Sequence, residues 1–304
     1  MGNRPTKNYD YSRPGVAMVT LKTQPGMWLC RISQAEFSLT DVGRVVQKEL
    51  LGIHGYYPQI KIGQYQIMPD HVHAMVHVTR PLPADVTLQR VFRGFKLGVN
   101  RICRAQVGVV SFQVFEKGMY DSLVFGREHL DREVAYIRDN VRRYRLRKAN
   151  PELFRQPRKV MSLPDGTPLW GFGNHFLLEH PRRVRVQFSR RTTEAEWQEI
   201  GEDVAFFLDQ GYVFVSPFIS PFEKRVLQEA EAKGGRAIHV THRYFGERYK
   251  PGGMLFDLCC EGRLLEISAA GEFARYARLD RAACLQLNAV AGGIATTQWS
   301  QWRG

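Results

Sequence analysis

Residues 59–79 read QIKIGQYQIMPDHVHAMVHVT, and this stretch predicts the fold of the first half of the chain. Apolar and polar side chains alternate over residues 59–68 and again over residues 71–79, which is the period of a half-buried β-strand. Because only Pro69 and Asp70 separate the two runs, we expect them to form a β-hairpin.

His71 and His73 lie two residues apart on the second of these strands, so both imidazoles project from the same face of the sheet. That geometry suits two ligands of one divalent metal, although a pair of partly buried strand histidines is the ordinary alternative. His77 shares the face and is either a third ligand or a solvated histidine. Asp70 either orients a ligand histidine or, as its place after Pro69 favours, is a turn residue.

Runs with the periods of strands and helices alternate on both sides of the hairpin. We expect strands at residues 16–23, 28–32, 59–68, 71–79 and 114–124, and helices at residues 40–51, 87–104 and 128–147. This order predicts an α+β domain in which helices cover a small antiparallel sheet, as in ferredoxin-like and RNA-recognition-motif folds.

Tyr136 and Asn140 are spaced i, i+4 on the last of these helices and therefore share one helical face. A tyrosine phenol can attack a phosphate as a nucleophile, and the amide oxygen of an asparagine can complete a three-ligand metal site. On spacing alone, an ordinary aromatic residue of an amphipathic helix is the alternative for Tyr136.

Motifs in a fixed order carry a resemblance to a known family. They are YDYS at residues 9–12, TLKT at 20–23, MPDHVHAMV at 68–76, the Phe-Lys of FRGFKLGVNR at 92–101, VFEKGMYDSLV at 114–124 and YIRDN at 136–140. Through them, residues 1–148 resemble the REP-associated branch of the single-tyrosine HUH transposases.

The resemblance implies a ferredoxin-like HUH domain and a metal-dependent endonuclease and strand transferase that acts on single-stranded DNA at hairpin-flanked sites. It implies Tyr136 as the nucleophile that forms a 5′-phosphotyrosine, with Mg²⁺ or Mn²⁺ held by His71, His73 and Asn140. The chain departs from the family pattern in having Val141 after Asn140, where a proline is usual, and in lacking the family's aromatic-rich strand.

The charge of the chain supports a polyanionic partner. The formal net charge is +13, and residues 1–150 hold 23 lysines and arginines against 12 acidic residues. Such a basic half favours binding to the phosphates of nucleic acid. The side chains that we expect to follow the DNA backbone are Arg90, Arg93, Lys96, Arg101, Arg142, Arg143, Arg145, Arg147 and Lys148. Basic residues at the end of a helix also suit the helix dipole, which is the alternative explanation for the last five.

Residues 149–170 contain four prolines and few periodic apolar positions, which predicts a linker. A different pattern follows it, with β-branched strands separated by helices. The expected strands are residues 184–188, 212–216, 237–241 and 264–268, and the expected helices are 194–209, 222–233, 254–261 and 280–295. The pattern predicts βαβ units and therefore a small Rossmann-like α/β domain with a parallel sheet over residues 171–304.

Residues 170–296 resemble the Rossmann-like domain of DNA-processing protein A and of the lysine-decarboxylase-like proteins. The resemblance rests on VRVQFSRR at 184–191, YVFVSPFISPFEKRVLQEA at 212–230, GGRAIHV at 234–240 and YKPGGMLFDLCCEGRLLEIS at 249–268. It implies a nucleotide or single-stranded DNA bound at the carboxyl ends of the strands, by Ser189, Arg190, Ser216, Ser220, Lys250 and Gly252. The sequence contains no GxGxxG, and a domain that only docks or stabilises is the alternative.

The remaining features exclude other classes of protein. The five cysteines form no CxxC pair, no apolar run approaches the roughly 20 residues of a membrane span, and the polar start is not a signal peptide. We therefore expect a cytoplasmic, nucleoid-associated protein, either a monomer or a homodimer. The alternative to the enzyme is a non-catalytic, domesticated DNA-binding protein with a module for nucleotide or single-stranded DNA.

Overall fold

The computed structural model describes residues 13–155, 157–189, 191–246, 249–269 and 279–299. It divides the chain into two compact units, Met1–Leu146 and Arg147–Gly304, and the division falls near the end of one helix, α4 (Arg127–Ala149). In the described part of the chain, no helix has the length and apolar character that crossing a membrane requires. The two units are described separately below.

Unit 1 is built on a four-stranded antiparallel sheet with the strand order β4-β5-β1-β6. The strands are β1 (Gly15–Lys22), β4 (Ile60–Ile67), β5 (His71–Val78) and β6 (Tyr120–Leu123), and a separate ribbon pairs β2 (Cys30–Ile32) with β3 (Phe37–Leu39). The helices are α1 (Asp41–Leu51), α2 (Ile53–Tyr56), α3 (Leu88–Val107) and α4. The antiparallel sheet with its helices and the β4–β5 hairpin are confirmed.

The long helices of unit 1 begin at the residues that the sequence indicates. Thr40 and Thr87 are the N-caps of α1 and α3, and their hydroxyls accept hydrogen bonds from the backbone of Gly43 and Arg90. Helix α3 ends at Gly108, whose positive φ of 75° is the left-handed conformation that glycine adopts without strain.

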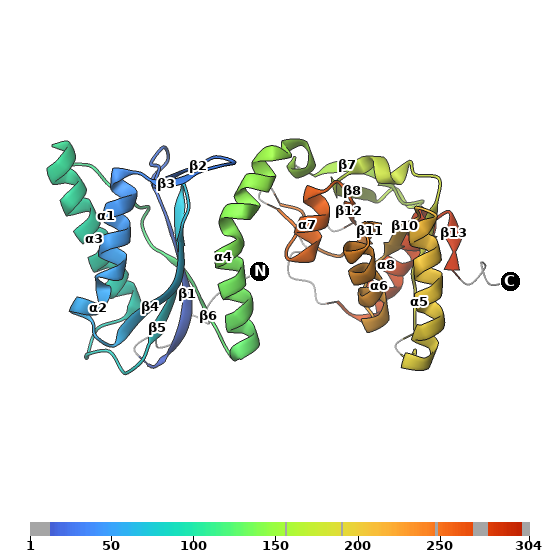
Figure 1. Ribbon diagram of the computed structural model, residues 1–304, viewed down its shortest axis with the longest axis horizontal. Coiled ribbons are helices and arrows are strands. Elements are labelled where there is room, and N and C mark those ends of the chain that lie inside the picture. Colours follow the sequence, from blue (N-terminus) through green and yellow to red (C-terminus); the bar gives the residue numbers. More distant parts are fainter. Residues whose placement is uncertain (1–12, 156, 190, 247–248, 270–278, 300–304) are drawn as a thin grey trace. The chain divides into compact units, whose positions relative to one another are not determined.

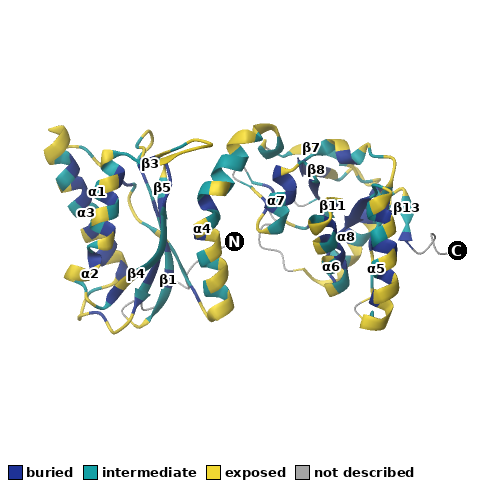
Figure 2. Cartoon of the chain, in the orientation of Figure 1, coloured by how far each residue is buried: buried dark blue, intermediate teal, exposed yellow. Residues whose placement is uncertain are grey.

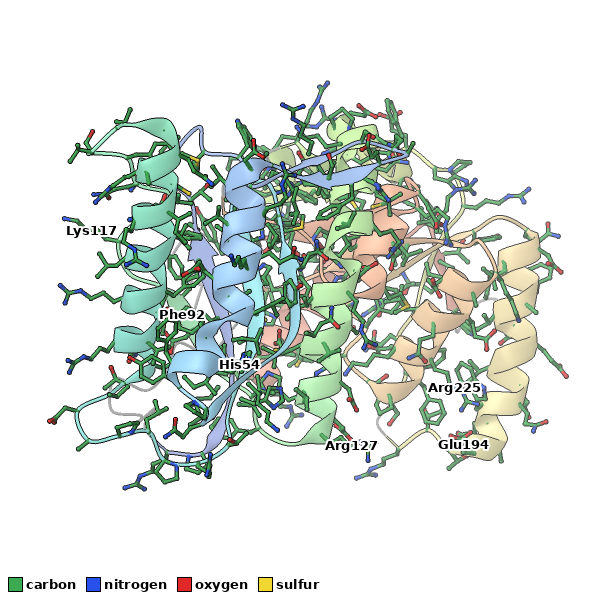
Figure 3. The ribbon with its side chains drawn as sticks, turned by 60° about the vertical axis from the view of Figure 1, so that its left-hand side comes forward. His54, Phe92, Lys117, Arg127, Glu194 and Arg225 are labelled. Carbon is green, nitrogen blue, oxygen red and sulfur yellow. The ribbon has the colours of Figure 1, made fainter. Side chains whose placement is uncertain are left out.

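Helices cover both faces of this sheet (Figure 1). Helices α1 and α3 pack on one face, where buried side chains such as Leu50 and Phe92 meet Leu21 and Val76 of the strands. Phe92 points from α3 toward the sheet, and the outer sides of these helices are exposed (Figures 2 and 3). Helix α4 covers the opposite face, through Ile137. Alternate residues of β5 therefore face either α1 and α3 or α4.

Unit 2 contains a seven-stranded sheet with the order β13-β9-β10-β11-β12-β8-β7. Its strands are β7 (Arg158–Ser162), β8 (Pro168–Gly173), β9 (Arg183–Arg185), β10 (Val213–Ser216), β11 (Arg236–Val240), β12 (Leu264–Ser268) and β13 (Thr297–Gln298). Its helices are η1 (Pro151–Phe154), η2 (His175–Leu178), α5 (Glu194–Asp209), α6 (Pro221–Ala232), α7 (Met254–Cys260) and α8 (Arg281–Ile294).

The expected parallel sheet is mixed. Strands β13, β9, β10, β11 and β12 run parallel, whereas β8 pairs antiparallel with β12, and β7 pairs antiparallel with β8. Strand β7 and the first three residues of β8 lie within residues 149–170, where the sequence predicts a linker. Three of the four prolines of that segment occupy positions that secondary structure tolerates: Pro151 begins η1, Pro164 lies in the turn between β7 and β8, and Pro168 is the first residue of β8. These prolines therefore do not prevent β7 and β8 from pairing in the sheet.

The helices of unit 2 divide between the two faces of its sheet. Buried residues of α5, α6 and α7 pack with Phe214, Ala237 and Leu264 in one cluster. Buried residues of α8 pack with Val215 and Ile238 in another. Because neighbouring strand residues point to opposite faces, the first three helices cover one face and α8 covers the other.

Candidate active site

The face of the unit 1 sheet that α4 covers holds the two histidines of the HVH motif. The residues between them and around them, Val72 and Ala74, point into the core on the opposite face. The imidazoles of His71 and His73 therefore stand together on the α4 side, with ring centroids 4.6 Å apart and ring planes at 74°.

Helix α4 brings Tyr136 to these rings. The centroid of its phenol ring lies 5.7 Å from that of His73, in an edge-to-face arrangement. Tyr136 remains 37% exposed, so a large substrate can reach it. The guanidinium of Arg143, two turns further along the helix, lies 5.8 Å from the centre of the phenol ring. A histidine pair and a tyrosine that are 63 residues apart in the sequence thus meet at one surface.

Each imidazole is oriented by an oxygen at its Nδ1 atom. The Nδ1 of His71 lies 2.7 Å from the carboxylate of Asp70, and the Nδ1 of His73 lies 2.8 Å from the hydroxyl of Thr20 on β1. The carboxylate fixes the tautomer of His71, because only a protonated Nδ1 can donate to it. The sequence favours a turn residue at Asp70 over one that orients a histidine, but the carboxylate makes the orienting contact with His71. Such outer partners are typical of metal-binding histidines, which then coordinate through Nε2.

Asn140 supplies a buried polar group one helical turn beyond Tyr136. Its side chain is only 8% exposed, and among the described residues its amide nitrogen has no hydrogen-bond partner. Because the oxygen and nitrogen of an amide are assigned from their partners, the same position can present the carbonyl oxygen. A buried amide with one polar atom that lacks a partner among the described residues fits a ligand of a hard cation. Within the described ranges, no group of three or more His, Cys, Asp or Glu side chains could hold a metal ion. A three-ligand site at His71 and His73 would therefore need the amide of Asn140.

His77 lies on the same face of β5 but in different surroundings. It is four residues beyond His73, about 13 Å along an extended strand. Its ring packs against Gly63 of β4, where a Cβ atom would lie 2.9 Å from Nε2. Burial lowers the pKa of His77. The ring of His77 is thus held by packing against β4, whereas the rings of His71 and His73 are held by the contacts of their Nδ1 atoms with Asp70 and Thr20.

The basic residues expected to follow DNA separate into two groups. Arg142, Arg143 and Arg145 belong to α4, on the histidine side of the sheet; Arg142 pairs with Asp139 and Arg145 donates to the backbone of Ser33. Arg147 and Lys148 lie in the last turn of this helix.

Arg90, Arg93, Lys96 and Arg101 belong to α3, on the opposite face of the sheet. The ammonium of Lys96 donates to the backbone carbonyls of Glu116 and Gly118, and burial lowers its pKa. A groove of about 630 Å³ runs between α3 and residues 113–119 and is lined by Arg93 and Lys96 among others. The α3 side chains therefore lie away from the histidines and the tyrosine.

Two residues near the site carried no role in the sequence analysis. Lys22 pairs in register with His71, and its ammonium lies 4.9 Å from the centre of the Tyr120 ring. Arg138 of α4 donates to the side chain of Gln64 on β4. Lys22 lies two residues after Thr20 on β1 and therefore faces the same side of the sheet. This spacing places Lys22 near the histidines only because β1 pairs with β5.

In unit 2, the described residues among those expected to bind a nucleotide or single-stranded DNA lie at the carboxyl ends of strands or after them, and Ser216 is the last residue of β10. The hydroxyl of Ser216 accepts from the backbone of Phe218, and Ser220 caps α6 in a capping box with Glu223. The hydroxyl of Ser189 accepts from the backbone of Arg191. Lys250 and Gly252 are exposed, whereas Arg190 and the YDYS stretch of residues 9–12 lie outside the described residues.

Comparison with known proteins gives distant similarities. No protein-family model matches the chain. An uncharacterized protein of Haemophilus influenzae is 23% identical over 154 residues, which cover 44% of this chain and 84% of that protein. A solved structure of a REP-associated tyrosine transposase bound to a REP hairpin is similar over 47% of this chain and 74% of its own, with 17% identity and a TM-score of 0.35. The proposal for function therefore rests on the side chains of this chain.

Proposed function

We propose that unit 1 is a metal-dependent endonuclease and strand transferase for single-stranded DNA, a transposase-like enzyme that works through a covalent phosphotyrosine. The observation that carries the proposal is the approach of the Tyr136 ring to within 5.7 Å of the His73 ring, beside His71. Phosphotyrosine chemistry requires a phenol next to a group that can hold a phosphate.

The metal ligands in this proposal are His71 and His73, each through Nε2, and the amide oxygen of Asn140. The Nδ1 contacts to Asp70 and Thr20 hold the two rings in this orientation. A divalent cation held by these side chains, Mg²⁺ or Mn²⁺, would act as a Lewis acid on the scissile phosphate and would offset the charge that grows in the transition state. Two nitrogen ligands and one oxygen suit Mn²⁺ at least as well as Mg²⁺, which prefers oxygen.

Tyr136 performs the covalent step. Its phenolic oxygen loses its proton and attacks the phosphorus in line with the leaving group; the bond between phosphorus and the 3′-oxygen breaks, and that oxygen takes up a proton as a 3′-hydroxyl. The chain then holds the 5′-phosphate as a tyrosine ester. A 3′-hydroxyl of another strand can attack this ester and release Tyr136, so the transfer needs no ATP.

Two cationic side chains lie near the proposed site. Arg143 lies over the Tyr136 ring, and Lys22 is the register partner of His71. A guanidinium and an ammonium there can hold the phosphates that flank the scissile bond. The hairpin-bearing partner follows from the resemblance of the motifs to the HUH family.

The test uses the full chain, Mn²⁺ and a labelled single strand that carries a hairpin. We expect a covalent adduct that survives denaturing electrophoresis, disappears with a chelator and is absent in Tyr136→Phe. Tyr56→Phe is the matched control, because Tyr56 is a 79% exposed phenol of α2 on the other face of the sheet. Binding of the strand without any adduct in the native chain would favour the non-catalytic DNA-binding protein instead.

A further inference from the structure

Unit 2 contains a topological switch point between β11 and β12. The chain leaving β11 leads to α7, whereas the chain leaving β12 leads to α8, and these two helices cover opposite faces of the sheet. In open α/β sheets, ligands bind outside the carboxyl ends of two neighbouring parallel strands whose connections diverge in this way. The position of a ligand site in unit 2 can thus be inferred from its topology alone.

Polar side chains lie in one row at this position. The sheet register pairs Ser216 of β10 with His239 of β11, and His239 with Glu266 of β12. All three face the same side of the sheet as Phe214, Ala237 and Leu264, two residues before each of them. The Nδ1 of His239 lies 2.9 Å from one carboxylate oxygen of Glu266.

Tyr249 completes the network from the loop that precedes α7. Its hydroxyl donates to the second carboxylate oxygen of Glu266 at 2.6 Å. Burial, and next the charge of Glu266, raise the pKa of Tyr249 far above the ordinary value, so it remains a neutral donor. Glu266 is fully buried, whereas the side chain of His239 is 14% exposed. The imidazole and the half-buried Tyr249 therefore both reach the edge of the network, and the fully buried carboxylate holds them.

Stability alone does not account for this network. A carboxylate without exposed surface, set between Leu265 and Ile267 in a core strand, costs more desolvation than an apolar side chain in its place. A histidine oriented by a buried carboxylate is instead the arrangement of a group that must present Nε2 in a fixed direction.

The surroundings of His239 are cationic. Arg243 follows β11 and is exposed, and burial together with the charges of Arg243 and His239 lowers the pKa of His242. The neighbouring loop after β10 cannot serve an anion, because Glu223 already accepts hydrogen bonds there from the backbone of Phe188, Ile219 and Ser220. Arg243 also interacts with Tyr249, where its charge and its hydrogen bond act to lower the pKa of the phenol against the larger effects of burial and Glu266.

We propose that the carboxyl ends of β11 and β12 form a binding site for a small anion, a phosphate or a carboxylate. His239 contacts the ligand through Nε2, Arg243 supplies the opposite charge, and Glu266 and Tyr249 are positioning residues. This site is separate in residues and chemistry from the nuclease proposed for unit 1, and neither proposal depends on the other.

The test follows the histidine ring nitrogens of the full chain by ¹⁵N NMR during titration with sodium phosphate and, separately, sodium acetate, at constant ionic strength. We expect the His239 signals to shift and saturate with one of the two anions, which identifies the chemical class. His239→Gln should abolish saturable binding, and Arg243→Gln should weaken it by about 10-fold or more, as loss of a charge-assisted contact does.

Arg236→Gln is the matched control, because Arg236 is an exposed arginine at the opposite end of the same strand. It should leave the affinity within about twofold, since the anion lies at the other edge of the sheet. Absence of a His239 shift with both anions would overturn the proposal. Equal weakening in Arg243→Gln and Arg236→Gln would do the same, because it would show attraction to net charge without a site.

Discussion

Each unit links a tyrosine to a strand histidine, by a ring contact in unit 1 and through the carboxylate of Glu266 in unit 2, and the two phenols differ in their surroundings. Tyr136 stands next to His73 at the surface, 37% exposed, with the guanidinium of Arg143 over its ring. Tyr249 is half-buried in unit 2, and its hydroxyl donates a hydrogen bond to the carboxylate of Glu266.

The comparison teaches that charge and exposure decide what a phenol can do. A half-buried phenol beside a carboxylate ionises less readily, because its anion would meet another negative charge in a medium of low polarity; the pKa of Tyr249 is raised accordingly. An exposed phenol beside a cation meets neither obstacle. Tyr136 therefore suits nucleophilic attack, and Tyr249 suits positioning.

The largest effect is expected in unit 1, on the rate of adduct formation. His73→Ala removes a proposed metal ligand and should reduce adduct formation by about 1,000-fold or more, as loss of a group essential to the transition state does. His77→Ala, on the same strand and face, should change it by less than about threefold, because that ring packs against Gly63. The initial rate of adduct formation in Mn²⁺ measures both.

This pair of variants also decides between the two interpretations of His77. If His77→Ala lost activity as severely as His73→Ala while the chain stayed folded by circular dichroism, His77 would be a ligand. Excess Mn²⁺ should partly restore a variant with weakened metal binding and should have no effect on one that has lost its nucleophile.

A smaller effect with opposite signs is expected at Asn140. Asn140→Leu should reduce adduct formation by about 100-fold, because the proposed third ligand is lost. The same change replaces a buried amide, whose nitrogen has no partner among the described residues, by an apolar group of similar size. Thermal unfolding of the variant should therefore occur at the same temperature or higher. A clear loss of stability would show that the amide serves the fold.

Much of this architecture is predictable from the sequence because the signals are local. The alternation in residues 59–79 and the capping threonines Thr40 and Thr87 depend only on near neighbours, and the hairpin and helix starts lie where they indicate. The mixed sheet of unit 2 was not predicted, because prolines in residues 149–170 resemble those of a linker until their partners in β12 are known.

The contacts of the sites depend on register, which a single sequence does not fix. Thr20 meets His73, and Lys22 meets His71, only because β1 pairs with β5 in one particular alignment. In the same way, Glu266 reaches His239 through the pairing of β11 with β12, so the network of unit 2 has no motif in the sequence. The sequence also does not show that α3 covers the face opposite the histidines, so it cannot separate the basic residues of α3 from those of α4.

The smallest expected effect is a difference in stability between variants of the two tyrosines. Tyr249→Phe removes a hydrogen bond to a buried carboxylate and should lower the free energy of unfolding of unit 2 by about 2 kcal/mol. Tyr136→Phe changes a residue that is 37% exposed and should lower stability by a smaller amount. Urea unfolding followed by the fluorescence of Trp197 and Trp299, both buried in unit 2, measures the first change, and circular dichroism measures the second. Equal stability losses would remove the distinction between a positioning phenol and a reactive one, because the two hydroxyls would then contribute alike to the fold.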